Sequence, residues 1–214
     1  MTLDPGAFLA VWAFLALNVL SPGPNVVNTI ATAMGSGRPA GLASAAGVAL
    51  GIGFWCLGMT LGMAGAFRLF PPLKAVLTLV GIALLVWFSL RYAMRARRGW
   101  RSGSTIPEGR GDLCPGAAFG RSLGVNATNP KALTTWVAIL SLFPVADARS
   151  GDIALLCVGA SVIAGAIHGV YAVVFSSPPA ARLYVRAAPV VNGAVAVFFA
   201  AFAVRLAAGL AAQP

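Results

Sequence analysis

Charged side chains are scarce in this chain of 214 residues: they form 9% of it, hydrophobic residues form 59%, and the mean hydropathy is +0.87. A soluble domain carries about a quarter charged residues, so this chain lacks the polar surface of a soluble globular fold. Its apolar residues come in long blocks, several of which approach the roughly 20 residues that a helix needs to cross a bilayer. We therefore expect an integral membrane protein surrounded by lipid.

Acidic residues are scarcer still, 5 against 15 lysines and arginines, for a net charge of +10. A nucleic-acid-binding domain places its basic residues on a wettable face, which these blocks lack, so we expect no nucleic acid partner. The cations instead indicate topology. With both termini outside, the inside loops hold ten lysines and arginines, the outside loops hold four, and Lys131 falls within a span. This bias favours outside termini, an even number of spans and a cytoplasmic segment 95–115.

Cysteine is also sparse, and Cys56, Cys114 and Cys157 include no C-x-x-C pair. Cys56 and Cys157 fall in predicted spans, where a free cysteine usually behaves as a small hydrophobe. The start of the chain lacks the basic segment of a cleavable signal peptide. No serine or aspartate constellation with a base supports an intramembrane hydrolase. We expect neither an enzyme nor a site for a cofactor or metal.

Six apolar segments predict transmembrane helices, at 7–34, 40–66, 72–94, 116–143, 152–176 and 188–210. The expected fold is thus an all-α polytopic membrane protein. The basic linker 95–115 separates an N-terminal three-helix repeat, 1–94, from a C-terminal one, 116–214. Because three helices per half is an odd number, the second repeat enters the membrane from the opposite side, as in many secondary transporters with inverted repeats.

The two halves share a short motif, N-x-x-[S/N]-P, in the first helix of each. It begins at Asn18 in the first half and at Asn126 in the second, about half the chain apart. Proline lacks a backbone N–H and disfavours helix in the residue before it. Each motif therefore predicts a broken helix at membrane depth, where freed carbonyls are tolerated only beside protein or a water-filled cavity.

Ser21 and Asn129 are suitable N-cap residues, and each precedes a proline, which suits the first position of a helix. We therefore predict that each break restarts a half-helix whose positive end points into the protein and suits a carboxylate. The alternative is that each proline only kinks its helix. The predicted substrate-binding residues are Asn18, Ser21, Pro22, Gly23, Pro24, Asn25, Asn126, Asn129, Pro130 and Lys131.

Two ionisable residues within predicted spans carry further hypotheses. Lys131 costs about 2.5–3.5 kcal/mol at the centre of a span. No acid lies in the interior of any predicted span, since Asp152 is the first residue of its span. Carbonyls, water or a bound anion must therefore satisfy Lys131, unless its side chain snorkels to an interface. His168 is the sole histidine and titrates near neutral pH when unperturbed. It is our candidate for proton coupling, and the alternative is a buried histidine that only makes hydrogen bonds.

Small residues repeat at four-residue spacing in two of the predicted spans. The pairs Gly47/Gly51 and Gly58/Gly62 lie in the second span, and Gly165/Gly169 lies in the fifth. Such pairs allow helices to approach closely. They predict close helix packing at all three places.

The chain resembles the LysE/RhtB family of amino-acid exporters over essentially its whole length. The resemblance rests on Ser21–Asn25, on "GSGRPAGLASAAGVALG", on "NATNPKALTTW" and on the closing "NGAVAVFFAAFAVRLA". It implies a multi-pass protein of the bacterial inner membrane that exports amino acids or related metabolites using the proton gradient. It also implies that the two proline motifs form the functional centre. Many members carry aspartate after P-G-P, where this chain has Asn25, which argues against a carboxylate relay there.

Two positive helix ends and Lys131, with no intramembrane acid, favour a substrate carboxylate and offer no counter-charge to a second ammonium. We expect neutral amino acids, or acidic or N-modified derivatives, over lysine and arginine. Two other functions stay open: a passive metabolite channel, and a thiol redox carrier that uses Cys56 and Cys157. The expected partners are the small-molecule substrate and lipid, and the sequence leaves open whether the chain forms a homo-oligomer.

Overall fold

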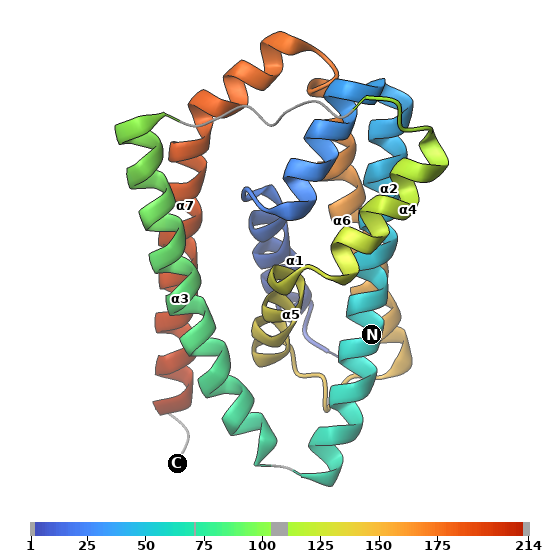
Figure 1. Ribbon diagram of the computed structural model, residues 1–214. Helices are drawn as coiled ribbons and strands as arrows, with labels where there is room; N and C mark the ends of the chain where they lie inside the picture. Colours follow the sequence, from blue (N-terminus) through green and yellow to red (C-terminus); the bar gives the residue numbers. More distant parts are fainter. Residues whose placement is uncertain (1–2, 71, 104–110, 212–214) are drawn as a thin grey trace.

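The computed structural model describes residues 3–70, 72–103 and 111–211, which form an all-helical structure (Figure 1). The helices of this part of the chain are α1 (Pro5–Leu20), α2 (Pro24–Leu69), α3 (Leu73–Ser102), α4 (Pro115–Ala127), α5 (Pro130–Leu142), α6 (Ser150–Val174) and α7 (Pro178–Ala211). Within α2, α3, α6 and α7, four stretches are long and apolar enough to cross a bilayer, and α1 is a shorter apolar helix. This composition is that of a polytopic membrane protein.

Both predicted helix breaks are present in the structure. The first separates α1, which ends at Leu20, from α2, which begins at Pro24. The second separates α4, which ends at Ala127, from α5, which begins at Pro130. Proline occupies the first turn of each restarted helix, where its missing N–H and fixed φ are tolerated.

Helix α2 is not straight, because its chain reverses at Gly37. This residue has φ 79° and ψ −179°, a backbone conformation that glycine adopts almost alone. The Thr29 and Ser44 hydroxyl oxygens lie 3.1 Å apart, although 15 residues of straight helix would separate them by about 22 Å. Helix α2 therefore consists of a first arm, 24–36, and a second arm, 38–69, as the predicted boundary between the first two spans requires.

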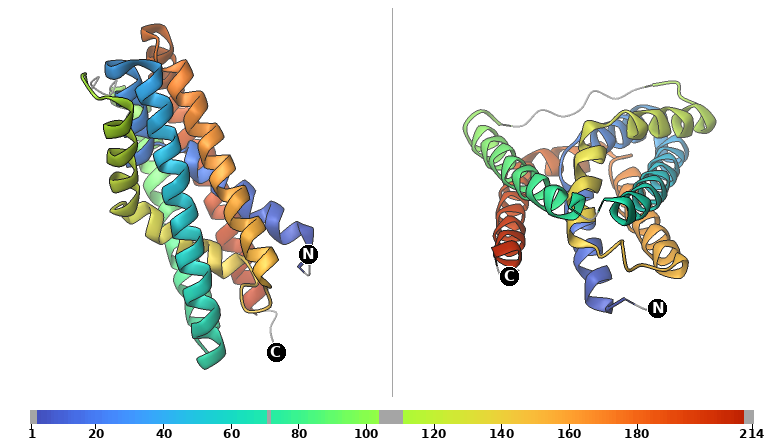
Figure 2. Two further views of the ribbon diagram at one scale, coloured as in Figure 1. Left: turned by 90° about the vertical axis from the view of Figure 1, so that its right-hand side faces the viewer. Right: turned by 90° about the horizontal axis from the view of Figure 1, so that it is seen from below.

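The helices form two groups with the short helices between them (Figure 2). Helix α3 runs beside α7 on one side, and α2 runs beside α4 and α6 on the other. The short helices α1 and α5 lie in the middle, so both breaks are near the centre of the molecule (Figure 1). An aromatic cluster fixes α1 against the first group, since the Phe199 ring of α7 lies 5.4 Å from Phe14 and 5.5 Å from Phe88.

Large apolar side chains face outward, and many polar ones are buried. Leu9, Val162 and Val197 are among the exposed apolar residues, whereas Asn18, Thr29 and Asn126 are buried. This is the reverse of a soluble globule and is the pattern expected of a protein surrounded by lipid.

The segments predicted to lie inside gather at one end of the molecule. The Arg38 Nε atom donates to the Ser176 hydroxyl (2.9 Å), and the Leu113 N–H donates to the Ser36 hydroxyl (3.1 Å). Helix α3 continues to Ser102, so the first part of the predicted linker 95–115 is helical. Residues 104–110 of that linker lie outside the described part of the chain.

The glycine pairs differ in what they pack against. A side chain at Gly47 would collide with the Phe119 carbonyl of α4, and one at Gly51 with Asn126. That pair therefore allows the close approach of α2 and α4 that was predicted. The same prediction is wrong for Gly58 and Gly62, which have no neighbour in the position of a side chain.

Candidate functional site

The first break lies between α1 and α2, and Ser21 is its first residue. We predicted Ser21 as an N-cap of the restarted helix, and this is wrong: Gly23 is the N-cap of α2, and Ser21 is the C-cap of α1. The Ser21 hydroxyl donates back to the Asn18 carbonyl at 2.5 Å. The reason is that Ser21 to Gly23 is extended, which places the serine too far from the new helix to cap it.

Side chains from three other helices satisfy the carbonyls that the first break frees. The Lys131 ammonium of α5 donates to the carbonyls of Asn18 (2.7 Å) and Ser21 (3.2 Å). The Tyr171 hydroxyl of α6 donates to the Leu20 carbonyl (2.9 Å), and the Arg95 guanidinium of α3 donates to the Pro22 carbonyl (2.9 Å). The Asn18 carbonyl also accepts hydrogen bonds from the Ser21 N–H and hydroxyl. The carbonyls of Leu20, Ser21 and Pro22 depend on the other helices, so the surrounding protein holds the break open.

Lys131 makes a third hydrogen bond, from its ammonium to the Ser21 hydroxyl at 2.6 Å. The Tyr92 hydroxyl lies 2.8 Å from the same oxygen, and the Tyr92 ring centroid is 5.6 Å from the ammonium. All three hydrogens of the ammonium thus have acceptors in the protein. The sequence predicted carbonyls, water or an anion as partners of Lys131. In the structure its partners are the two carbonyls and the Ser21 hydroxyl.

The second break is capped as the sequence predicts. Asn129 is the N-cap of α5, and its side-chain oxygen accepts the Lys131 N–H at 3.0 Å. Because Lys131 is the second residue of α5, its side chain leaves the helix beside the second break and reaches back to the first one. Lys131 therefore joins the two breaks into one structural unit.

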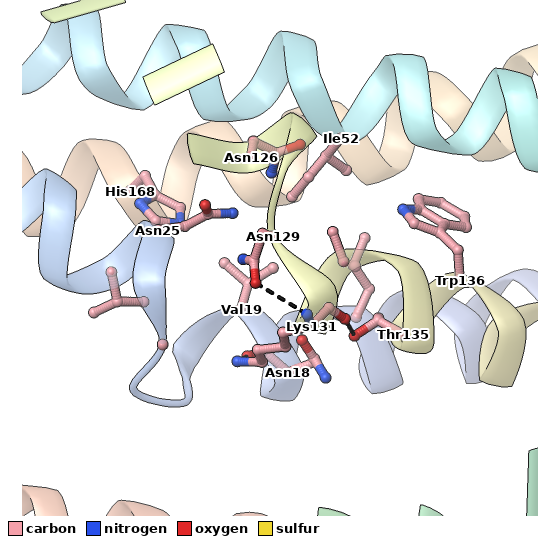
Figure 3. A pocket seen from close by; sticks show the side chains of 14 residues that line it. Asn18, Val19, Asn25, Ile52, Asn126, Asn129, Lys131, Thr135, Trp136 and His168 are labelled. Atoms are coloured by element: carbon pink, nitrogen blue, oxygen red, sulfur yellow. Dashed lines mark hydrogen bonds between the residues drawn. The ribbon is translucent and has the colours of Figure 1, made fainter. Parts of the chain in front are cut away.

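A cavity of about 40 Å³ lies between the two breaks (Figure 3). The first turns of both restarted helices line it, through Gly23, Asn25 and Val26 on α2 and through Lys131 and Ala132 on α5. The positive ends of two helices thus face one space, which favours a negative group there. A cavity of this volume holds about three waters, at about 10–15 Å³ each.

Three asparagines that line this cavity keep side-chain atoms without a hydrogen-bond partner. These atoms are Nδ2 of Asn18, Oδ1 of Asn25, and both Nδ2 and Oδ1 of Asn126. Asn126 is fully buried and Asn18 is 5% exposed. A buried amide without a partner costs about 1–3 kcal/mol, so unpaired donors and acceptors gathered around one cavity indicate a binding site.

A second cavity, of about 190 Å³, lies on the α3 side of the same breaks. We call it the vestibule, and it is lined by Gly23, Pro24, Trp87, Phe88, Arg91, Tyr92, Arg95, Asn129, Lys131 and Thr134. Three cations face it, and each lies over an aromatic ring: Arg91 over Trp87 at 5.0 Å, and Arg95 and Lys131 over Tyr92 at 5.3 and 5.6 Å. Its lining contains no acid and suits an anionic group beside apolar surface.

His168 is 1% exposed and lines the central cavity from α6. Its Nδ1 atom lies 2.9 Å from the Thr29 hydroxyl on the first arm of α2. Its ring also meets the Tyr171 ring edge-on, with centroids 5.9 Å apart. Figure 3 shows His168 beside Asn25, across the cavity from Lys131.

The structure brings most of the predicted site residues to these two spaces. The central cavity is lined by Asn18, Gly23, Asn25, Asn126, Asn129, Lys131 and His168. Pro24 lines the vestibule, Ser21 lies behind the Lys131 ammonium, and Pro22 contributes its carbonyl to Arg95. The side chain of Pro130 lies outside the described part of the structure.

Several residues that line these spaces or bind the first break were not predicted as site residues from the sequence. Arg95 was counted only as a linker cation, and Tyr92 and Tyr171 bind the first break from distant helices. Ile52 and Trp136 line the cavity as apolar residues within apolar spans, and nothing in the local sequence distinguishes them from lipid-facing ones.

The two intramembrane cysteines lie together, with the Cys56 and Cys157 sulfur atoms 2.8 Å apart between α2 and α6. Both are free thiols. Neither residue lines the central cavity or the vestibule. The pair therefore lies apart from the space that the break residues enclose.

Apolar spanning helices, paired breaks and an internal polar cavity define a membrane transport protein rather than a soluble enzyme. The family model of the LysE type translocator matches residues 16–209, and the chain belongs to this family. It is 28% identical to the uncharacterized membrane protein YahN of Escherichia coli K12, over 96% of this chain and 92% of that protein.

Two further relatives are efflux proteins. The threonine efflux protein of Escherichia coli K12 is 27% identical, over 93% of this chain and 96% of that protein. The homoserine/homoserine lactone efflux protein of Salmonella typhimurium is 30% identical, over 58% of this chain and 57% of that protein. No solved structure matches this chain.

Proposed function

We propose that this protein exports amino acids across the bacterial inner membrane and binds them in the central cavity. The observation that carries the proposal is the set of unpaired amide atoms on Asn18, Asn25 and Asn126. A buried amide nitrogen donates hydrogen bonds and a buried amide oxygen accepts them. Together they complement a ligand that presents both a carboxylate and an ammonium on one carbon, as an α-amino acid does.

The charges around the cavity support a substrate with one positive group at most. The positive ends of α2 and α5 face the cavity, and Lys131 lies between them. The vestibule adds Arg91 and Arg95. A carboxylate is stabilised there, whereas the second ammonium of lysine finds no counter-charge. We therefore favour neutral amino acids, or derivatives that keep or add a carboxylate.

The arrangement of helices supports alternating access. Helix α3 runs beside α7, and α2 runs beside α6. In the proposed three-helix repeats, α3 corresponds to α7 and the second arm of α2 corresponds to α6. The central cavity, at about 40 Å³, holds about three waters and is too small for threonine or leucine. We infer that the two inverted repeats move relative to each other to admit the substrate, with the larger vestibule as one route to the site.

Counterflow in proteoliposomes tests this function. Vesicles loaded with unlabelled threonine, homoserine or leucine should accumulate the same labelled amino acid, and vesicles loaded with lysine should not accumulate labelled lysine. A saturable exchange is the result expected of a carrier. Non-saturating, voltage-driven flux would instead show a channel, and equal exchange of lysine would refute the proposed selectivity.

Proton antiport is part of the proposal, with His168 as the coupling residue. His168 is the only histidine, and it faces the cavity. The variant His168→Gln keeps a hydrogen-bonding side chain but does not titrate. It should retain counterflow and lose the accumulation that a pH gradient drives; if gradient-driven accumulation persists, another group couples the proton.

A further inference from the structure

A continuous chain of hydrogen bonds connects His168 to the surface of α4 through the interior of the protein. From His168 Nδ1 it runs to the Thr29 hydroxyl (2.9 Å), the Ser44 hydroxyl (3.1 Å) and the Ser122 hydroxyl (2.6 Å). Asn28 then donates from Nδ2 to the Ser122 oxygen (2.8 Å). The three hydroxyl residues are fully buried, and the chain crosses α6, both arms of α2, and α4.

The end of the hydrogen-bond chain that lies farthest from His168 determines which atom donates in each of its hydrogen bonds. The Arg121 guanidinium has donors and no acceptor, and its Nε atom donates to Asn28 Oδ1 at 3.2 Å. This contact assigns the Asn28 oxygen to the arginine side, so the amide nitrogen must face Ser122 and donate to it. Arg121 is exposed and anchors the orientation from outside the buried part.

Each hydroxyl has one hydrogen to donate, and only one arrangement uses all three. Ser122 accepts from Asn28 and donates to Ser44, Ser44 donates to Thr29, and Thr29 donates to His168 Nδ1. In the opposite order, Thr29 would donate to Ser44 and Ser44 to Ser122. Ser122 would then accept from both Asn28 and Ser44, and its own buried hydroxyl hydrogen would have no acceptor within the hydrogen-bond chain. The forward order therefore makes Nδ1 of His168 an acceptor.

We infer that this donor chain holds His168 in the tautomer that carries its hydrogen on Nε2. The ring nitrogen left to face the central cavity is then a hydrogen-bond donor. This role of the tautomer rests on the proposed function. If the cavity binds an amino acid, the Nε2–H of His168 donates to the carboxylate of that amino acid, opposite Lys131. The titratable groups that face the ring are Tyr171 on α6 and Lys131 across the cavity on α5. Thr29, Ser44, Ser122, Asn28 and Arg121 are positioning residues.

Nitrogen-15 NMR of the histidine ring tests this inference directly, because the chain has one histidine. The protein is labelled with ¹⁵N-histidine, purified through an affinity tag without histidine, and measured in lipid without substrate. We expect a protonated Nε2 and an unprotonated Nδ1, which resonate far apart. A wild-type spectrum with the hydrogen on Nδ1 would overturn the inference, whatever the variants do.

Three variants separate the hydrogen-bond chain from helix packing. Thr29→Val removes the donor to His168 and should produce a mixture of tautomers, whereas Thr29→Ser keeps the hydroxyl and should match the wild type. Thr32→Val is the matched control, since Thr32 is buried on the same arm of α2 and its hydroxyl has no partner. It should also match the wild type. An unchanged spectrum in Thr29→Val would contradict the assignment.

Counterflow gives the second measurement. Thr29→Val should raise the concentration of threonine or leucine needed for half-maximal exchange, while Thr32→Val should not. If the wild type exchanges no amino acid at all, the proposed function fails, but the tautomer measured without substrate still stands or falls by itself. If exchange is normal in Thr29→Val and its tautomers are mixed, the role of Nε2–H in substrate binding is wrong.

Discussion

At the scale of single residues, the contacts of Lys131 assign it a structural role that the sequence alone does not show. The sequence places a lysine in a span without an acid and leaves carbonyls, water or an anion as partners. In the structure its ammonium binds the carbonyls of Asn18 and Ser21 and the Ser21 hydroxyl. Lys131 therefore first stabilises the break, and its charge acts on the cavity that it also lines.

Replacing Lys131 should abolish transport. In Lys131→Ala the Ser21 carbonyl loses its partner, at a cost of about 1–3 kcal/mol when buried, and the Asn18 carbonyl keeps only its bonds from Ser21. The cavity also loses its cation. We expect loss of counterflow with the protein still present in the membrane, and a lower melting temperature in detergent. Arg98→Ala, which removes an exposed cation of α3, is the control and should behave as wild type. Wild-type exchange by Lys131→Ala would refute the role given to this residue.

Local sequence predicted the capping of one break and missed that of the other. Asn129 caps α5 because proline and the new helix follow it at once. Ser21 precedes an extended Pro22–Gly23 segment, so the helix restarts too late for it. The partners of the first break, Tyr171 and Arg95, lie far along the chain. No local pattern contains such contacts, since packing of distant helices decides them.

At the scale of helices, the close contact of α2 with α4 positions Asn126. A side chain at Gly51 would lie 2.6 Å from the Asn126 Oδ1 atom, whereas one at Gly58, two turns further along the same helix, would meet nothing within 4 Å. The sequence predicted close packing for both glycines alike. It could not separate them, because the distinction depends on where the short helix α4 ends.

The two glycines provide a matched test of the site. Gly51→Ala should displace the Asn126 side chain and reduce counterflow severalfold, with an increased half-saturation concentration. Gly58→Ala adds the same methyl group to open space and should leave exchange unchanged. Abundance in the membrane and the melting temperature identify a general packing defect. Equal activity of the two variants would show that the position of Asn126 is unimportant for transport.

At the scale of the whole molecule, the basic segments gather at one end, where Arg38 contacts Ser176 and Ser36 contacts Leu113. Hydropathy indicates the four long apolar stretches that the structure contains, and the predicted spans 7–34 and 40–66 leave a boundary where the chain reverses at Gly37. The grouping of α3 with α7 and of α2 with α6 is not readable from hydropathy, since every span is similarly apolar. Which end faces the cytoplasm is our proposal from the lysine and arginine bias.

Cys114 allows this orientation to be measured. It is exposed and lies at the basic end, whereas Cys56 and Cys157 are replaced by alanine to leave a single thiol. A membrane-impermeant maleimide should label Cys114 in inside-out vesicles and not in intact spheroplasts. Ser150→Cys, with Cys114→Ala, places a thiol at the opposite end, at the exposed start of α6, and should give the opposite result. Labelling of Cys114 in spheroplasts would reverse the proposed topology.

The same background tests the thiol redox carrier. The Cys56 and Cys157 sulfur atoms lie 2.8 Å apart but line neither the central cavity nor the vestibule. The variant that carries both Cys56→Ala and Cys157→Ala should therefore exchange amino acids at the wild-type rate. Loss of exchange in the folded double variant would make the thiol pair part of the mechanism.

The central claim is that unpaired asparagine amides around the cavity bind the amino acid, and one comparison of counterflow tests it most directly. Asn126 lines the cavity, whereas Asn192 on α7 also has a buried, unpaired side-chain oxygen but lines neither the cavity nor the vestibule. Leucine at either position removes an unpaired polar group of similar burial. The account predicts that Asn126→Leu loses exchange of labelled threonine and leucine while remaining folded, and that Asn192→Leu exchanges normally. Normal exchange by Asn126→Leu would contradict it.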